Sequence, residues 1–170
     1  MSCLINKGYV LGCKDSTGGV RNVYLANFSG ATTFTVDGSD VITAITSSPS
    51  FYKYECPKQT AGVVETATVN VQNGTVLYSQ VLTLVLNKMS ADMRNEMMLL
   101  AKAPLFVIAE DQNGLFWLLG KQNAVDLTTG TSGTGTNFGD RNGYSLTFTA
   151  LEPASISNIT YASFSANIAG

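Results

Sequence analysis

Two Asn-Gly pairs, each set between apolar-rich runs, constrain the fold of this chain more than any other feature. Asn73-Gly74 separates residues 63–72 from residues 75–86, and Asn113-Gly114 separates residues 105–110 from residues 115–119. Asn-Gly tolerates positive φ and is the strongest short-range signal for a type I′ hairpin turn. The sequence therefore predicts two β-hairpins. The strands of the first exceed the usual length of about 5 to 6 residues, so we expect that hairpin to extend beyond its own domain.

The residue pattern of the long hairpin predicts how it is buried. One face of the first strand carries Val63, Glu65, Ala67, Val69 and Val71, and the other carries Val64, Thr66, Thr68 and Asn70. On the return strand, nearly every residue after Gln80 is apolar or Thr on both faces. We expect that end of the hairpin to be covered on both sides.

The rest of the chain is also rich in strand signals. Strands are expected over residues 20–27, 31–36, 41–45, 51–56 and 144–151. One helix is expected between Ser90, placed as an N-cap, and Pro104, with Met89, Met93, Met97 and Leu100 forming its apolar stripe. The predicted fold class is mainly β, with a single helix packed on the sheet.

Two segments lack such signals. Residues 128–137 read Thr-Thr-Gly-Thr-Ser-Gly-Thr-Gly-Thr-Asn, a low-complexity stretch that is too polar to pack a core and is expected to form a mobile loop. Residues 154–170 carry scattered apolar residues among Ser, Ala and Asn. We therefore expect one β-rich domain over residues 1–153, followed by a C-terminal tail over residues 154–170.

Composition argues against several functional classes. The net charge of −2 lacks the basic excess of a tight DNA binder, and the absence of His removes the commonest general base and transition-metal ligand. Only 13% of residues are charged, which leaves much neutral surface for contacts. No run is long enough for a membrane span, and the first residues do not read as a signal peptide.

The remaining candidates for chemistry have plain structural explanations. Glu110 and Asp111 are adjacent acids beside a hairpin turn, where acids are ordinarily solvated. Trp117 is expected in a core or an interface. The spacing of Cys3, Cys13 and Cys56 fits no zinc site and no compact disulfide framework, which indicates free thiols of a protein folded in the cytosol. No catalytic residue, cofactor or metal site is predicted.

The order of elements, an N-terminal meander, a long hairpin, a helix, a second hairpin and a closing strand, resembles the tail-tube fold of tailed bacteriophages. More specifically, the chain is similar to virion proteins of phages of Bacteroidetes-type hosts, crAss-like phages among them. The segments that carry this likeness are Met1-Ser2-Cys3-Leu4, residues 51–55, residues 82–88, residues 117–121 and residues 139–149. The resemblance implies a β-sandwich or half-barrel flanked by one helix.

The resemblance also implies a function. Subunits of this fold form rings, commonly hexameric, which stack into a tube around a channel through which DNA passes without tight binding. The implied protein is a virion structural component of the tail or neck, made in the host bacterial cytoplasm, without enzymatic activity or cofactor. Its partners would be further copies of itself and other tail or neck proteins, with no membrane contact.

The resemblance further implies which residues make contacts. The long hairpin would meet the neighbouring subunit through Val69, Val71, Asn73, Gly74, Val76 and Tyr78. The N-terminal arm and the polar loop, through Gly130, Thr131, Ser132, Gly133 and Thr134, would contact the adjacent ring.

Alternatives remain open at this point. The same architecture builds neck rings and tail terminators that do not stack. A β-sandwich adhesin or carbohydrate-binding module would also suit a neutral Thr- and Asn-rich surface, although the chain shows no signal peptide.

Overall fold

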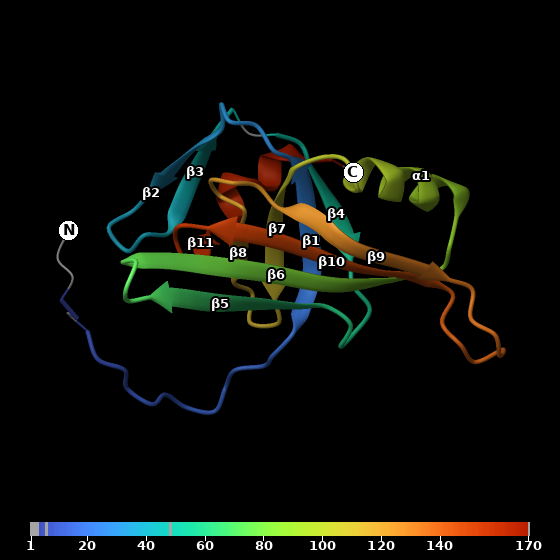
Figure 1. The fold of residues 1–170 in the computed structure, drawn as a ribbon, viewed down its shortest axis with the longest axis horizontal. Coiled ribbons are helices and arrows are strands. Elements are labelled where there is room, and N and C mark those ends of the chain that lie inside the picture. Colours follow the sequence, from blue (N-terminus) through green and yellow to red (C-terminus); the bar gives the residue numbers. More distant parts are fainter. Residues whose placement is uncertain (1–3, 6, 48, 170) are drawn as a thin grey trace.

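The protein folds into two β-sheets and one flanking α-helix, as seen in a computed structural model that describes residues 4–5, 7–47 and 49–169. Figure 1 shows the smaller sheet crossing in front of the larger one, with the helix at one end. The sequence prediction of a mainly β half-barrel fold with one helix is confirmed. Among the described residues, no helix combines the length and hydropathy of a membrane span.

The larger sheet, sheet A, contains eight strands and curls into a half-barrel. Its order is β12 (Ile168–Ala169), β4 (Phe51–Glu55), β1 (Val20–Asn27), β7 (Leu105–Asp111), β8 (Phe116–Leu119), β11 (Ser157–Ile159), β3 (Ile42–Thr46) and β2 (Thr33–Val36). Most neighbours are antiparallel, but β12 runs parallel to β4 and β11 runs parallel to β3.

The smaller sheet, sheet B, is antiparallel throughout. Its order is β5 (Gly62–Asn70), β6 (Thr75–Asn87), β10 (Gly143–Glu152) and β9 (Asp126–Gly133). The helix α1 (Ala91–Leu100) follows β6 directly and begins where predicted, because the Ser90 hydroxyl accepts a hydrogen bond of 3.2 Å from the Met93 amide. Met89, Met93, Met97 and Leu100 all pack against the core, which confirms the predicted stripe.

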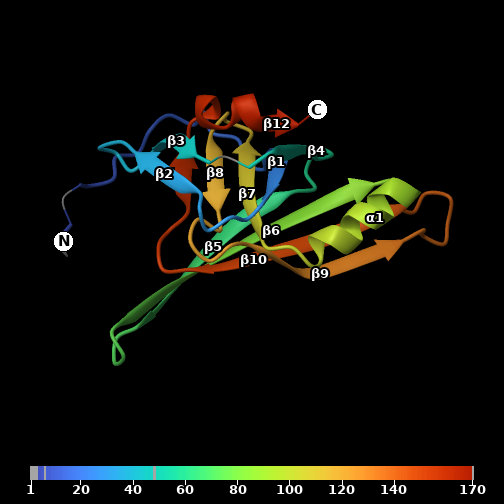
Figure 2. The same cartoon turned by 90° about the horizontal axis from the view of Figure 1, so that it is seen from above.

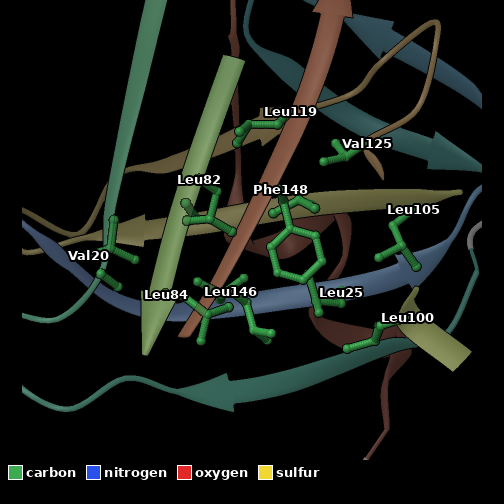
Figure 3. Packing of buried hydrophobic residues seen from close by; sticks show 14 of the residues in the cluster. Val20, Leu25, Leu82, Leu84, Leu100, Leu105, Leu119, Val125, Leu146 and Phe148 are labelled. Atoms are coloured by element: carbon green, nitrogen blue, oxygen red, sulfur yellow. The ribbon is translucent and has the colours of Figure 1, made fainter. Parts of the chain in front are cut away.

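Both faces of sheet A are buried, in two separate apolar clusters. Leu25 of β1 and Leu105 of β7 point toward sheet B, where they meet Leu82, Leu146 and Phe148 (Figure 3). Alternate residues of the same strands, such as Tyr24 and Phe106, point into the curl of sheet A.

The C-terminal segment completes the second cluster and is not a detached tail. After β11 it forms two short 3-10 helices, η1 (Tyr161–Ser163) and η2 (Ser165–Asn167), and ends in β12. Between these helices lies Phe164, which has 0% exposure and makes edge contacts with the rings of Tyr24, Phe51 and Phe116. The sequence prediction separated residues 154–170 as a tail, whereas residues 157–169 supply three pairings of sheet A.

The two Asn-Gly hairpins form, but their predicted turn type is wrong. A type I′ turn needs positive φ at both central residues, yet only Gly74 and Gly114 have it, and Asn73 and Asn113 do not. The first strand pair closes at Asn70 and Thr75, leaving a four-residue loop over residues 71–74. In the second turn, the Asp111 amide donates to the Leu115 carbonyl, which encloses three residues. Longer loops with a single left-handed glycine are the next most common hairpin connections.

The predicted two-sided covering of β6 is also wrong. Leu82, Leu84 and Leu86 are buried on the face toward sheet A, while Thr83 on the opposite face is exposed and Val81 and Val85 are half-buried. Nothing in the described chain packs on that outer face as the core packs on the inner one. Sheet B therefore has one buried face and one open face.

Candidate assembly interface

The β5–β6 hairpin extends well beyond the layers of the domain. Figure 2 shows its tip projecting beyond sheet A and beyond the other strands of sheet B. The side chains there are open to solvent, with Val69 at 61% and Val71 at 88% exposure, and Val76 and Leu77 are exposed as well. We call residues 66–79 the hairpin overhang, and it confirms the expectation that this hairpin outgrows its domain.

The hairpin overhang has one apolar face. Ala67 pairs with Tyr78, and Val69 pairs with Val76, so these four side chains lie on the same face as half-buried Val63 and its buried partner Leu82. The stripe thus continues the surface that packs the core nearer the root. Within the described residues, no segment covers the Val69–Val76 pair, since both side chains remain exposed.

A partly buried hydrogen-bond cluster fixes the root of the overhang. Glu65 accepts from the Ser155 hydroxyl and the Ile156 amide, at 2.6 Å each, and from the Gln80 side chain at 3.2 Å. The Gln80 amide oxygen in turn accepts from the Gly120 backbone amide at 3.2 Å. Because both strands are held at this cluster, the overhang leaves the domain in a defined direction.

Sheet B also has two free edges, β5 and β9. Each of these strands has a neighbour in the sheet on one side only, which leaves backbone donors and acceptors along its outer edge. Residues 66–79 contain no charged residue, and β9 contains a single one, Asp126. Edges that are long and almost uncharged favour pairing with another chain.

The prediction of a mobile loop over residues 128–137 is wrong for most of this segment. Residues 128–137 were expected to form a mobile loop, but Gly130, Thr131, Ser132 and Gly133 lie in β9, and only Thr134 and its successors form the turn into β10. Thr-rich segments have high β propensity, and β10 supplies the ladder that holds this one. Thr128 adds a 3.1 Å hydrogen bond to the Thr147 carbonyl.

The turn after β9 is also ordered by its own contacts. The Asp140 carboxylate accepts from the amides of Asn137 and Thr136, at 2.8 and 2.9 Å, and these bonds lower the pKa of Asp140. The role of these residues in contacts between rings stays a prediction.

The adjacent acids Glu110 and Asp111 serve separate structural roles. Glu110 is buried and accepts from Asn22 at 2.6 Å and Tyr24 at 3.2 Å, with the Arg21 guanidinium 3.6 Å away. Burial and the Glu110 carboxylate raise the pKa of Tyr24. Asp111, next along the strand, binds its own turn instead. The expectation that both acids are simply solvated is therefore wrong, and the two carboxylates do not converge on a common site.

Asp111 organises the β7–β8 turn and should make stability pH-dependent. Desolvation opposes its ionisation, but bonds from the Leu115 amide, the Trp117 indole and the Asn113 amide, at 2.9, 3.1 and 2.8 Å, together lower its pKa. A lowered folded-state pKa stabilises the fold above the ordinary value of 3.8, and this contribution is lost as the pH falls through the folded-state value.

We therefore expect Asp111→Ala to lower the free energy of unfolding by about 1 to 2 kcal/mol at neutral pH. The difference from the unmodified protein should shrink as the pH falls below 3.8. Urea unfolding at a series of pH values measures this, with Asp126→Ala on the exposed edge as the control. A difference that stays constant down to acid pH would contradict the assignment.

Other chemistry is sparse in the described part of the chain. It contains no group of three or more His, Cys, Asp or Glu residues that could hold a metal ion. Cys13 is an exposed free thiol and Cys56 a half-buried one, while Cys3 lies outside the described residues.

The candidate interface thus consists of a projecting hairpin with one apolar face and the two free edges of sheet B. Comparison of the chain with models of known protein families, with curated proteins and with solved structures finds no match.

Proposed function

We propose that this chain is a virion structural protein, a subunit of a phage tail tube whose rings, hexameric by the resemblance, surround a DNA channel. The observation that carries the proposal is the hairpin overhang, whose apolar face continues the core-facing surface of sheet B without cover. A second copy would bury this face, because an exposed apolar face next to an unpaired strand edge promotes association between monomers.

The even number of strands in sheet B supports ring formation. With four antiparallel strands, the two edge strands β5 and β9 run in opposite directions. The β5 edge of one copy can therefore pair antiparallel with the β9 edge of a second copy in the same orientation. Such a contact joins two different surfaces, and repeated contacts of that kind close into a ring when the rotation permits.

The charge of the chain is compatible with a DNA channel. A net charge of −2 and an open, largely neutral face on sheet B offer DNA few phosphate contacts, so the affinity for passing DNA would be low. The proposed protein therefore acts through assembly and not through catalysis. A neck ring or tail terminator would share the lateral contact and lack stacking.

The test is assembly of the purified protein, followed by mass photometry and negative-stain microscopy. We expect rings that form on concentration, with end-on views giving the symmetry. Val69→Lys with Val76→Lys places two charges on the apolar face of the overhang, and burying them would raise the assembly concentration at least about a hundredfold. Thr68→Lys with Asn70→Lys adds the same charges to the opposite face and should assemble far better.

Three outcomes would count against the proposal. Monomers at every concentration would remove its basis, and assembly insensitive to the Val69 and Val76 charges would place the contact elsewhere. Binding of a glycan by a monomeric chain would favour a carbohydrate-binding module.

A further inference from the structure

The segment before β1 is apolar and exposed. We call residue 5 together with residues 7–16 the N-terminal arm, none of which belongs to a helix or strand. Ile5 is 97% exposed, and Tyr9, Val10 and Leu11 are each more than 80% exposed. These four side chains are not buried by any described part of the same chain, although clustered apolar residues are normally covered in a soluble protein.

The arm leaves the domain from a fixed point. The Thr17 amide donates to the Asn113 side chain at 2.8 Å, and the Asn113 side chain donates back to the Thr17 carbonyl at 3.0 Å. Figures 1 and 2 both show the arm running to the end of the molecule where the hairpin tip lies, opposite α1.

The opposite end of the molecule carries an apolar groove. It lies between α1 and strands β1 and β4 and has a volume of about 690 Å³, within the range of ordinary binding clefts. Leu99 and Tyr52 line it and are exposed, at 62% and 50%, and Met93 also lines it and packs against the core. Two carboxylates, Glu55 and Glu96, lie along the same groove with Lys53 as the one cation among its lining residues.

Charge favours this groove over the hairpin overhang as the binding site of the arm. Lys7 and Lys14 flank the apolar residues Tyr9, Val10 and Leu11, and with Asp15 beside Lys14 the arm keeps an excess of one positive side chain. The overhang, residues 66–79, has no carboxylate that could pair with these lysines. The groove, in contrast, has two carboxylates and one lysine among its lining residues, an excess of one negative side chain. The arm and the groove thus match in both apolar character and charge.

We infer that the N-terminal arm of one copy occupies the groove between α1 and β4 of a second copy placed end to end with it. The inference rests on the proposed function, in which such an end-to-end contact joins successive rings. Because the arm and the groove lie at opposite ends of the molecule, each copy can give one arm and receive another. The contact therefore propagates along a tube axis and distinguishes a stacking subunit from a neck ring.

Disulfide trapping between two variants of the full chain tests the contact. Both carry Cys3→Ser and Cys13→Ser, one adds Gly8→Cys on the arm, and the other adds Lys53→Cys at the groove rim. A side chain at Gly8 meets nothing within 4 Å, so the change leaves the fold intact. Native Cys56 stays, because burial raises the pKa of its thiol to about 11 and keeps it protonated near neutral pH.

The two variants are mixed at a concentration where rings form and are then oxidised. We expect a heterodimer on a non-reducing gel, because a seated arm holds the two thiols at an effective concentration of roughly millimolar. Gly8→Cys mixed with an Asn73→Cys variant, at the hairpin tip, is the matched control and should give little product. Gly8→Cys oxidised without a partner variant measures the background.

The outcomes separate the inference from the proposed function. Rings that form without the Gly8–Lys53 product, or with a stronger Gly8–Asn73 product, overturn the inference and leave lateral assembly standing. Monomers throughout overturn both. Leu99→Glu should keep single rings but abolish stacks, while Met98→Glu, also exposed on α1 but outside this groove, should stack normally; equal stacking of the two would also overturn the inference.

Discussion

Gly143→Ala is expected to destabilise the domain by about 3 kcal/mol, which is large for the addition of one methyl group. A Cβ atom at Gly143 would lie against the Leu86 carbonyl oxygen, far inside van der Waals contact, and 3.1 Å from the Asn87 Cα. Both obstacles are backbone atoms of β6, and Gly143 pairs directly with Asn87. The methyl can therefore be accommodated only if β6 and β10 separate at this point.

The control for this change lies one strand away. Gly133 is the register partner of Gly143 on β9, and a Cβ there would meet nothing within 4 Å. Gly133→Ala should change stability by no more than about 0.5 kcal/mol. Thermal unfolding of the two variants makes the comparison, because each kcal/mol shifts the Tm by roughly 2–4 °C in a domain of this size. Equal midpoints would show that the strands have room to move.

Glu152→Ala is expected to cost about 2 to 3 kcal/mol. This carboxylate is 2% exposed and accepts from the backbone amides of Asn123, at 2.8 Å, and Gln122, at 3.1 and 3.2 Å. These bonds hold the turn between β8 and β9 against the end of β10. Alanine removes a charged acceptor shared by two backbone donors, so the turn loses its anchor.

Two further variants make the Glu152 prediction specific. Glu152→Gln keeps one acceptor oxygen but turns an amide group toward a backbone donor, so its loss of stability should fall between those of the unmodified protein and the alanine variant. Glu55→Ala removes an exposed acid whose partner is Lys53, at 3.0 Å, and should have little effect. Urea unfolding gives all three free energies, and an effect of Glu152→Ala as small as that of Glu55→Ala would contradict the prediction.

The elements that were predictable from the sequence carry clear local signals. The β5–β6 and β7–β8 hairpins follow from turn residues and alternation, and α1 follows from Ser90 and the methionine stripe. In each case the signal and the structure occupy the same few dozen residues. The turn type was wrong because Asn-Gly also fits longer loops, in which only the glycine needs positive φ.

The elements that were missed carry no local strand signal of their own. β9 has the composition of a flexible linker, and its pairing with β10 overrides that local tendency. β12 has two residues and exists because Phe51 and Tyr52, far earlier in the chain, lie beside it. For the proposed assembly surface, alternation indicates the apolar stripe, but only the position of Glu65 and Gln80 at the root reveals where the core ends and the overhang begins.

The integration of the C-terminal segment has a consequence for biosynthesis. Ile168 pairs with Phe51, and Phe164 fills the centre of the curl in sheet A, so the half-barrel cannot close until residue 169 has emerged from the ribosome. Nascent chains ordinarily begin to fold from their N-terminal side. Here the early strands β1 and β4 must wait with an open hydrophobic hollow, and in the proposed assembly a chain still being translated would be unable to join a neighbour. Late closure would thus delay self-association until each copy is fully synthesised through this segment.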